Sequence, residues 1–156
     1  MKGEVGRLCL MSNHPDNEPV LGYAPGSPER SALQVEMDRQ MGEVVEIPCI
    51  INGEKVFTGN TTTQVIPHRH GHVLANVHIG GKAEIDAACK AATAAQKDWI
   101  AMGLEARCAI FEKCAELLAG DWRMKINAAT VLNQSKTAFQ AEIDSGGRAP
   151  CLAVVL

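Results

Sequence analysis

The chain has 156 residues, of which 46% are hydrophobic and 21% charged, a composition that fits one globular domain and excludes fibrous and disordered classes. Its 15 Lys and Arg residues are interspersed with 18 Asp and Glu residues, and the net charge of -3 provides no basic field for nucleic acid. Nucleic acid is therefore not an expected partner. No apolar run approaches the roughly 20 residues of a membrane span, so a membrane is not expected either.

The six cysteines, at positions 9, 49, 89, 108, 114 and 151, include no Cys-x-x-Cys pair. This spacing favours free thiols in a reducing compartment over a disulfide framework. Residues 1–12 carry basic and acidic side chains around a short apolar patch, which predicts neither a secretory signal nor a clear transit peptide.

A proline-rich stretch over 13–28 precedes the first regular element and predicts an extended lead-in that lies against another surface. The following pattern predicts a helix over 28–41, with Pro28 in its first turn. Three apolar side chains recur on one face of that helix: Leu33, Met37 and Met41.

Strand patterns occupy the next fifty residues. Asn52-Gly53 separates two β-rich runs within 47–57, and this dipeptide predicts a type I′ hairpin turn. Residues 61–66 predict a further strand that ends at Pro67, and residues 73–79 alternate at period two, as in a half-buried strand.

Three helical segments follow Gly80-Gly81. In the first, an alanine-rich stripe includes Ile85 and Trp99, and in the second, over 104–119, an apolar face includes Ile110 and Leu117. The third starts near residue 122 and continues, after a polar step at 134–137, with Phe139 and Ile143. The order predicts an α+β arrangement of a β-hairpin and strands followed by three helical segments, which together form a layer that covers something else.

Three imidazoles at His68, His70 and His72 would project from one face of a strand as metal ligands do. Pro67 and Gly71 instead favour a polar turn in which these histidines bond backbone groups, and no carboxylate or cysteine nearby completes a ligand set. We therefore assign no metal ligand.

The segment Gln-Ser-Lys-Thr at 134–137 has a Lys-Thr pair but lacks the glycine and preceding strand of a phosphate loop. It is interpreted as a break between two helical pieces, with Ser135 or Thr137 capping the second piece and Lys136 in solvent.

Candidate catalytic side chains are few. No cysteine has the polar setting that activates a nucleophile, and Cys89 and Cys114 lie beside apolar stripes, which favours packing. Glu142 and Asp144 are expected to be solvated carboxylates. We assign no catalytic and no cofactor-binding residue.

A series of short motifs nevertheless occurs in a distinctive order. They are Asn-Glu-Pro-Val-Leu at 17–21, Gly-Ser-Pro-Glu-Arg at 26–30, Ala-Leu-Gln at 32–34, Ile-Pro-Cys at 47–49, His-Gly-His at 70–72, Lys97 with Trp99, Arg107 with Ile-Phe at 110–111, Gln134 with Lys-Thr at 136–137, and Gln-Ala-Glu-Ile-Asp at 140–144. In order and spacing the chain resembles the amino-terminal portion of the delta-1-pyrroline-5-carboxylate dehydrogenases, a branch of the aldehyde dehydrogenase superfamily. The resemblance divides the chain into an unmatched lead over 1–16, a matched segment over 17–144 and a divergent tail over 145–156.

The resemblance implies an α/β parent fold whose Rossmann-like sheet this chain lacks, and mitochondrial matrix enzymes that oxidise L-glutamate gamma-semialdehyde to glutamate with NAD in proline catabolism. In that family a cysteine nucleophile, a glutamate base, an oxyanion-stabilising asparagine and the cofactor-binding segments belong to later regions. A substrate-side glutamate follows the Ala-Glu-Ile-Asp match, where this chain has Arg148, and Ser135 stands where the family usually has glycine.

These observations lead to three hypotheses. The first is a truncated dehydrogenase that binds no NAD and has no activity alone. The second is a non-catalytic interaction module that binds a full-length dehydrogenase subunit or another partner through its uncovered helical faces. The third and least favoured is a small metal-binding protein that uses the three histidines.

Overall fold

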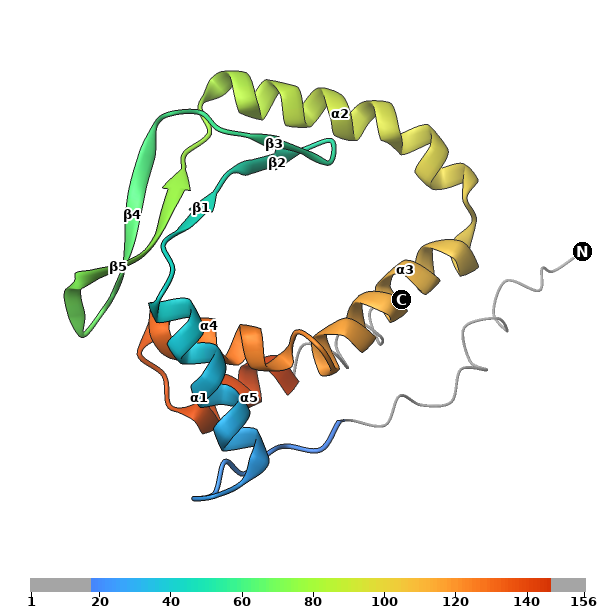
Figure 1. Cartoon of the computed structure of the whole chain (residues 1–156). Helices are drawn as coiled ribbons and strands as arrows, with labels where there is room; N and C mark the ends of the chain where they lie inside the picture. The colour runs from blue at the N-terminus through green and yellow to red at the C-terminus, as the bar shows by residue number, and fades with distance from the viewer. Residues whose placement is uncertain (1–17, 147–156) are drawn as a thin grey trace, which may run out of the picture.

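The computed structural model describes residues 18–146 as five helices and five strands, which follow one another around an open ring (Figure 1). The helices α1, α4 and α5 pack together at one end of the ring, the strands form one side, and α2 and α3 complete it. In chain order the elements are α1 (Pro28–Met41), β1 (Val45–Ile47), β2 (Cys49–Ile51), β3 (Glu54–Val56), β4 (Thr61–Ile66), β5 (Arg69–His78), α2 (Lys82–Ala101), α3 (Leu104–Ala119), α4 (Arg123–Gln134) and α5 (Ala138–Gly146).

Helix α1 has the predicted bounds because its first turn is capped as the sequence indicates. The Ser27 hydroxyl oxygen accepts a hydrogen bond from the Arg30 backbone N–H at 3.3 Å, and Pro28 occupies a first-turn position where its missing N–H costs nothing. The predicted apolar face is also confirmed, since Leu33 is buried and Met37 packs beside it.

The predicted hairpin is present as the antiparallel pair β2–β3. Its two loop residues, Asn52 and Gly53, have φ angles of +52° and +80°, the pair of positive values that a type I′ turn requires. Asparagine and glycine adopt positive φ angles with the least steric strain, and these two residues alone therefore sufficed to predict the turn.

The other strands form a separate sheet in the order β1-β5-β4, with β1 parallel and β4 antiparallel to β5. Strand β1 ends before Pro48, which has no N–H to donate. Pro48 therefore separates Ile47, the first residue of the β-rich run predicted before Asn52, from the rest of that run in β2. The turn after β4 is shorter than predicted, because β5 already starts at Arg69 and Gly71 lies within it.

Buried apolar side chains form two small clusters where the strands meet the helices. In one, Tyr23 of the lead-in and Leu33 pack on Ala128 of α4. In the other, the β4 residue Ile66 packs on Leu132, also of α4, and the neighbouring strand contributes Leu74. Helix α4 therefore joins the lead-in, α1 and the sheet.

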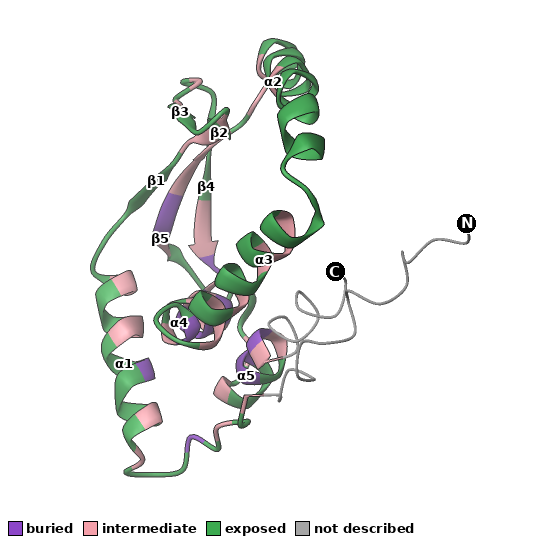
Figure 2. Cartoon of the chain, turned by 90° about the vertical axis from the view of Figure 1, so that its right-hand side faces the viewer, coloured by how far each residue is buried: buried purple, intermediate pink, exposed green. Residues whose placement is uncertain are grey.

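The helices α2 and α3 contain no buried residue (Figure 2). On the faces predicted to be apolar, the side chains of Trp99 and Ile110 are 38% and 47% exposed. The fold is thus α+β, as predicted, and within residues 18–146 the only parallel pairing is the short one between β1 and β5. None of the described helices is long and apolar enough to span a membrane.

Candidate functional site

The strongest concentration of polar chemistry in the described residues lies around Glu142, a residue of α5 whose side chain is fully buried. Its Oε2 accepts hydrogen bonds from the Tyr23 hydroxyl at 2.6 Å and from Asn127 Nδ2 at 2.8 Å. Its Oε1 accepts one from the Leu21 backbone N–H at 2.9 Å and forms an ion pair with Arg123. The expectation that Glu142 is a solvated carboxylate is therefore wrong.

Helix periodicity explains how α4 contributes two of these donors. Arg123 and Asn127 are four residues apart on α4 and so lie on the same face, which packs against α5 and the lead-in. Arg123 also donates from Nη2 to the Pro19 carbonyl at 2.6 Å. The sequence prediction for this helix named only apolar positions, and it missed this pair because buried polar residues do not produce a hydrophobic period.

The lead-in is fixed by the same cluster. Tyr23 has a φ angle of +51°, a left-handed value that costs a non-glycine residue roughly 1–2 kcal/mol. Its ring is buried against Leu33 and its hydroxyl is hydrogen-bonded to Glu142, and these contacts offset the strain. The predicted contact of the lead-in with another surface is thus made, in residues 18–23, with α4 and α5.

Two ionisable groups of the cluster have shifted acidities. Burial alone would raise the pKa of the Glu142 carboxyl, but hydrogen bonds from Arg123, Tyr23 and the Leu21 N–H outweigh it, so the pKa lies below its ordinary value. Burial and then the hydrogen bond to Glu142 raise the pKa of the Tyr23 phenol. Glu142 therefore remains ionised and Tyr23 neutral through the physiological range.

This cluster holds the chain together and is not arranged to act on a substrate. A general base must reach the proton it removes, whereas the Glu142 carboxylate is fully buried and both its oxygens already accept hydrogen bonds from the protein. The chemistry of the cluster is that of an anchor for the lead-in.

The three candidate histidines do not converge. His68 Nδ1 is 2.8 Å from the Ser135 hydroxyl, His72 Nε2 is 3.0 Å from the Met41 carbonyl, and His70 is exposed. Within residues 18–146, no three His, Cys, Asp or Glu side chains are placed to hold one metal ion. The metal-binding hypothesis has no geometric support in this part of the chain.

The break between α4 and α5 has the predicted place and one of the two predicted caps. Thr137 Oγ1 accepts from the Gln140 backbone N–H at 3.2 Å, and Gln140 Oε1 accepts from the Thr137 N–H at 3.0 Å, a reciprocal capping box. Ser135 instead ends α4 with a left-handed backbone, φ +53°. Lys136 is paired with Asp144 and only partly exposed, so the expectation that these two charges are simply solvated is wrong.

The cysteines within the described residues are free thiols, as predicted. Cys89 and Cys114 are exposed, which makes the prediction of core packing wrong for this chain. Cys9 and Cys151 lie outside the described residues, as does Arg148.

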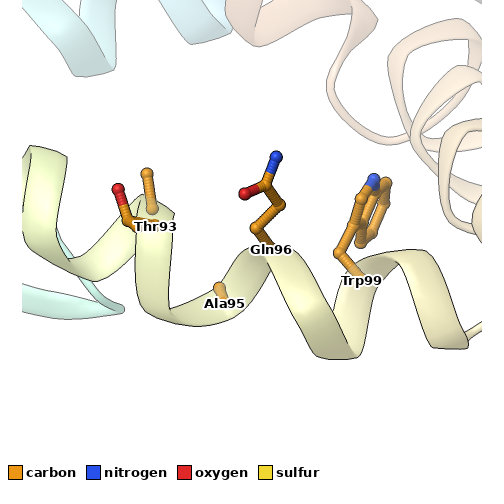
Figure 3. Close-up of a pocket in the computed structure, with 5 residues that line it drawn as sticks. Thr93, Ala95, Gln96 and Trp99 are labelled. Carbon is orange, nitrogen blue, oxygen red and sulfur yellow. The ribbon is translucent and has the colours of Figure 1, made fainter.

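A hollow of 410 Å³ lies along one side of α2, where the side chains of Thr93, Gln96 and Trp99 project in the same direction (Figure 3). Dinucleotide phosphates bind at glycine-rich turns that lead from a parallel strand into a helix N-terminus. The hollow has no positively charged side chain and lies in mid-helix, where backbone N–H groups are already hydrogen-bonded. These residues do not fit NAD, and no step of its chemistry is assigned to them.

A groove of 360 Å³ between α1 and the start of α5 does contain Arg30 and Lys136. It has no glycine-rich turn after a parallel strand, and Lys136 is already paired with Asp144. It does not provide a dinucleotide site either.

Comparisons with known proteins agree on one group of relatives. The chain is 44% identical over 130 residues to the delta-1-pyrroline-5-carboxylate dehydrogenase of Agaricus bisporus, covering 83% of this chain and 24% of that enzyme. It is 40% identical over 139 residues to the mitochondrial enzyme of that name from Bos taurus, covering 89% of this chain and 25% of the relative.

The solved structure of the Mycobacterium tuberculosis delta-pyrroline-5-carboxylate dehydrogenase bound with NAD and cobalamin is also similar. The TM-score is 0.82 at 42% identity, and the match covers 86% of this chain and 25% of that chain. The chain therefore spans about a quarter of the length of the relatives it matches.

The model of the aldehyde dehydrogenase family matches residues 57–153, which is more than half of the sequence. This match includes β4, β5 and all the helices from α2 to α5. The chain therefore belongs to the aldehyde dehydrogenase family.

Proposed function

We propose that this chain is the amino-terminal part of a delta-1-pyrroline-5-carboxylate dehydrogenase and has no dehydrogenase activity alone. In the complete enzyme the reaction is the NAD-dependent oxidation of L-glutamate gamma-semialdehyde to glutamate, in proline catabolism. The observation that carries the proposal is 40–44% identity, over 83–89% of this chain, to relatives with that name.

The structure supports a framework role for the chain within such an enzyme. The Glu142 cluster anchors the lead-in, and α4 joins α1 to the sheet, whereas the Glu142 carboxylate itself is buried away from any substrate. Binding of NAD and the chemical step would be supplied by the remaining three quarters of the fold.

A direct test compares the chain alone with a covalent fusion of the chain to the region of the Bos taurus relative that it does not match. Each protein is incubated with pyrroline-5-carboxylate and NAD, and NADH formation is followed by absorbance. We expect turnover only from the fusion, and the intact relative is the positive control. Turnover by the chain alone, or a folded but inactive fusion, would contradict the proposal.

The same proposal extends to location. The Bos taurus and Homo sapiens relatives are mitochondrial enzymes by name, and we propose the mitochondrial matrix for the protein to which this chain belongs. Protease protection of the endogenous protein in intact mitochondria and in mitoplasts measures this, and digestion by protease added to intact mitochondria would argue against it.

A second candidate function is a non-catalytic module that binds a full-length dehydrogenase subunit. It is favoured by exposed apolar side chains on α2 and α3, which together are called the α2–α3 arm below. Among them are Trp99, Ile110 and Leu117. Size-exclusion chromatography of the chain mixed with the intact Bos taurus enzyme tests it, and separate elution of the two proteins would count against it.

A further inference from the structure

One side of α2 has the composition of a packed helix interface, yet its side chains are exposed in the described structure, where Trp99 at its end meets Phe111 of α3. Ala92 and Ala95 are small enough to let another backbone approach, Trp99 supplies a large apolar surface, and the hollow that they line contains no charged side chain (Figure 3). Thr93 and Gln96 add only neutral hydrogen-bonding groups. A complementary surface would be apolar and uncharged.

The α2–α3 arm that carries this surface contacts other elements at its two ends and contains no buried residue between them. At its start α2 contacts β2, and the Gly81 backbone N–H donates to Glu84 Oε2 at 2.8 Å, which caps the first turn of the helix. At its far end α3 contacts α4 and α5. Between these points Trp99 of α2 meets Phe111 of α3 edge to face, with ring centroids 6.4 Å apart.

The comparisons supply a candidate occupant for this surface. The solved Mycobacterium tuberculosis enzyme superposes on 86% of this chain with only 25% of its own residues, so three quarters of that molecule has no counterpart here. A second copy of this chain would instead bring the same exposed α2–α3 arm and would lack the same three quarters of the fold.

We propose that the α2 face formed by Ala92, Thr93, Ala95, Gln96 and Trp99 docks the remaining part of the dehydrogenase fold, and that it does so even when that part is a separate polypeptide. The inference rests on the proposed function for the identity of the partner. It goes beyond it by assigning the docking face and by predicting assembly without a covalent link.

The test is co-expression of the full chain with an affinity-tagged remainder of the Bos taurus relative, followed by affinity purification and size-exclusion chromatography. Co-expression lets the two polypeptides fold together, so neither must be stable alone. We expect the two to elute as a complex of equal stoichiometry.

A matched pair of variants locates the interface. Ala92→Arg places a charge on the proposed face, whereas Ala94→Arg places the same charge about 200° around the same helix. Both alanines are exposed and both variants keep the same helix propensity. We expect Ala92→Arg to lower the recovered complex by about tenfold or more, as for a charge in the centre of an interface, and Ala94→Arg to leave it unchanged.

Three outcomes would overturn the docking proposal: no complex with the tagged remainder, equal recovery of both arginine variants, or equally strong binding to the intact Bos taurus enzyme, whose own amino-terminal part would occupy the same site if the proposal holds. Failure of the proposed function is seen separately. A complex that forms but produces no NADH, together with an inactive covalent fusion, would refute the function and leave the docking face in place.

Discussion

At the scale of single residues, Glu142 is the most constrained side chain of the described part. Its carboxylate is fully buried and accepts hydrogen bonds from the lead-in and from α4. A buried charge of this kind stabilises a fold only while every donor stays in place, because each unpaired partner then has to be desolvated without compensation. The cluster therefore acts as a unit.

Replacing Glu142 with alanine should be far more damaging than replacing its neighbour. Glu142→Ala leaves the Arg123 guanidinium buried without its counterion, which we expect to lower the free energy of unfolding by about 3–5 kcal/mol. Ile143→Ala, at an exposed site on the same helix, should cost less than about 1 kcal/mol. Urea denaturation followed by circular dichroism measures both, and similar midpoints for the two variants would exclude an anchoring role.

The depressed pKa of Glu142 also predicts a dependence of stability on pH. A carboxyl whose folded pKa lies below its unfolded value contributes stability above the unfolded value and loses it as the pH falls through the folded value. The wild-type chain should therefore lose stability as the pH falls through 4.5, the ordinary value of this group, and below. Glu142→Gln should show a shallower loss over the same range in parallel urea titrations, and identical pH profiles would contradict the assignment.

At the scale of elements, Ser135 at the junction between α4 and α5 combines a strained backbone with a side-chain hydrogen bond. Ser135 has the left-handed backbone that glycine adopts most easily, and its hydroxyl is 2.8 Å from His68 Nδ1 on the turn after β4. The hydrogen bond and the strain act in opposite directions on stability. Their balance determines what glycine would do there.

A double-mutant cycle separates these two effects. In a His68→Ala background, Ser135→Gly should stabilise the chain by about 0.5–1 kcal/mol, because only backbone strain is removed. In the wild-type background the lost hydrogen bond should cancel most of that gain. Equal effects of Ser135→Gly in both backgrounds, measured by urea denaturation, would show that the histidine contact contributes nothing.

At the scale of the whole molecule, stability is expected to be uneven. Helix α4 is packed against α1, α5 and the sheet, whereas α2 and α3 contain no buried residue. Local opening requires little free energy where few apolar contacts are lost. Amides of α2 should therefore exchange with deuterium faster than those of α4 in the chain alone, and should become protected in the covalent fusion. Equal protection of both helices in the isolated chain would contradict this picture.

The local elements were largely predictable from sequence because their signals are short-range. Helix α1, the Asn52-Gly53 hairpin and the bounds of α3 follow from capping, turn chemistry and periodicity within a few residues. The ordered motifs also indicated the family to which the chain belongs. Strand β1 was missed because three residues paired with β5 carry too little pattern to distinguish them from a loop.

The Glu142 cluster could not be predicted in the same way. Tyr23 and Glu142 are separated by 119 positions, and neither belongs to a spacing that implies contact. Exposure of the α2 and α3 stripes was equally undetermined, since an apolar face does not reveal whether its partner lies in the same chain.

The sequence by itself thus determined the family, the α+β order of elements and most of their bounds, because these depend on local backbone preferences and on motif order. Only the tertiary structure decided that a carboxylate expected in solvent is the buried anchor of the lead-in, and that α2 and α3 contain no buried residue within residues 18–146. Both depend on which distant segments meet when the chain folds, and no local preference specifies that.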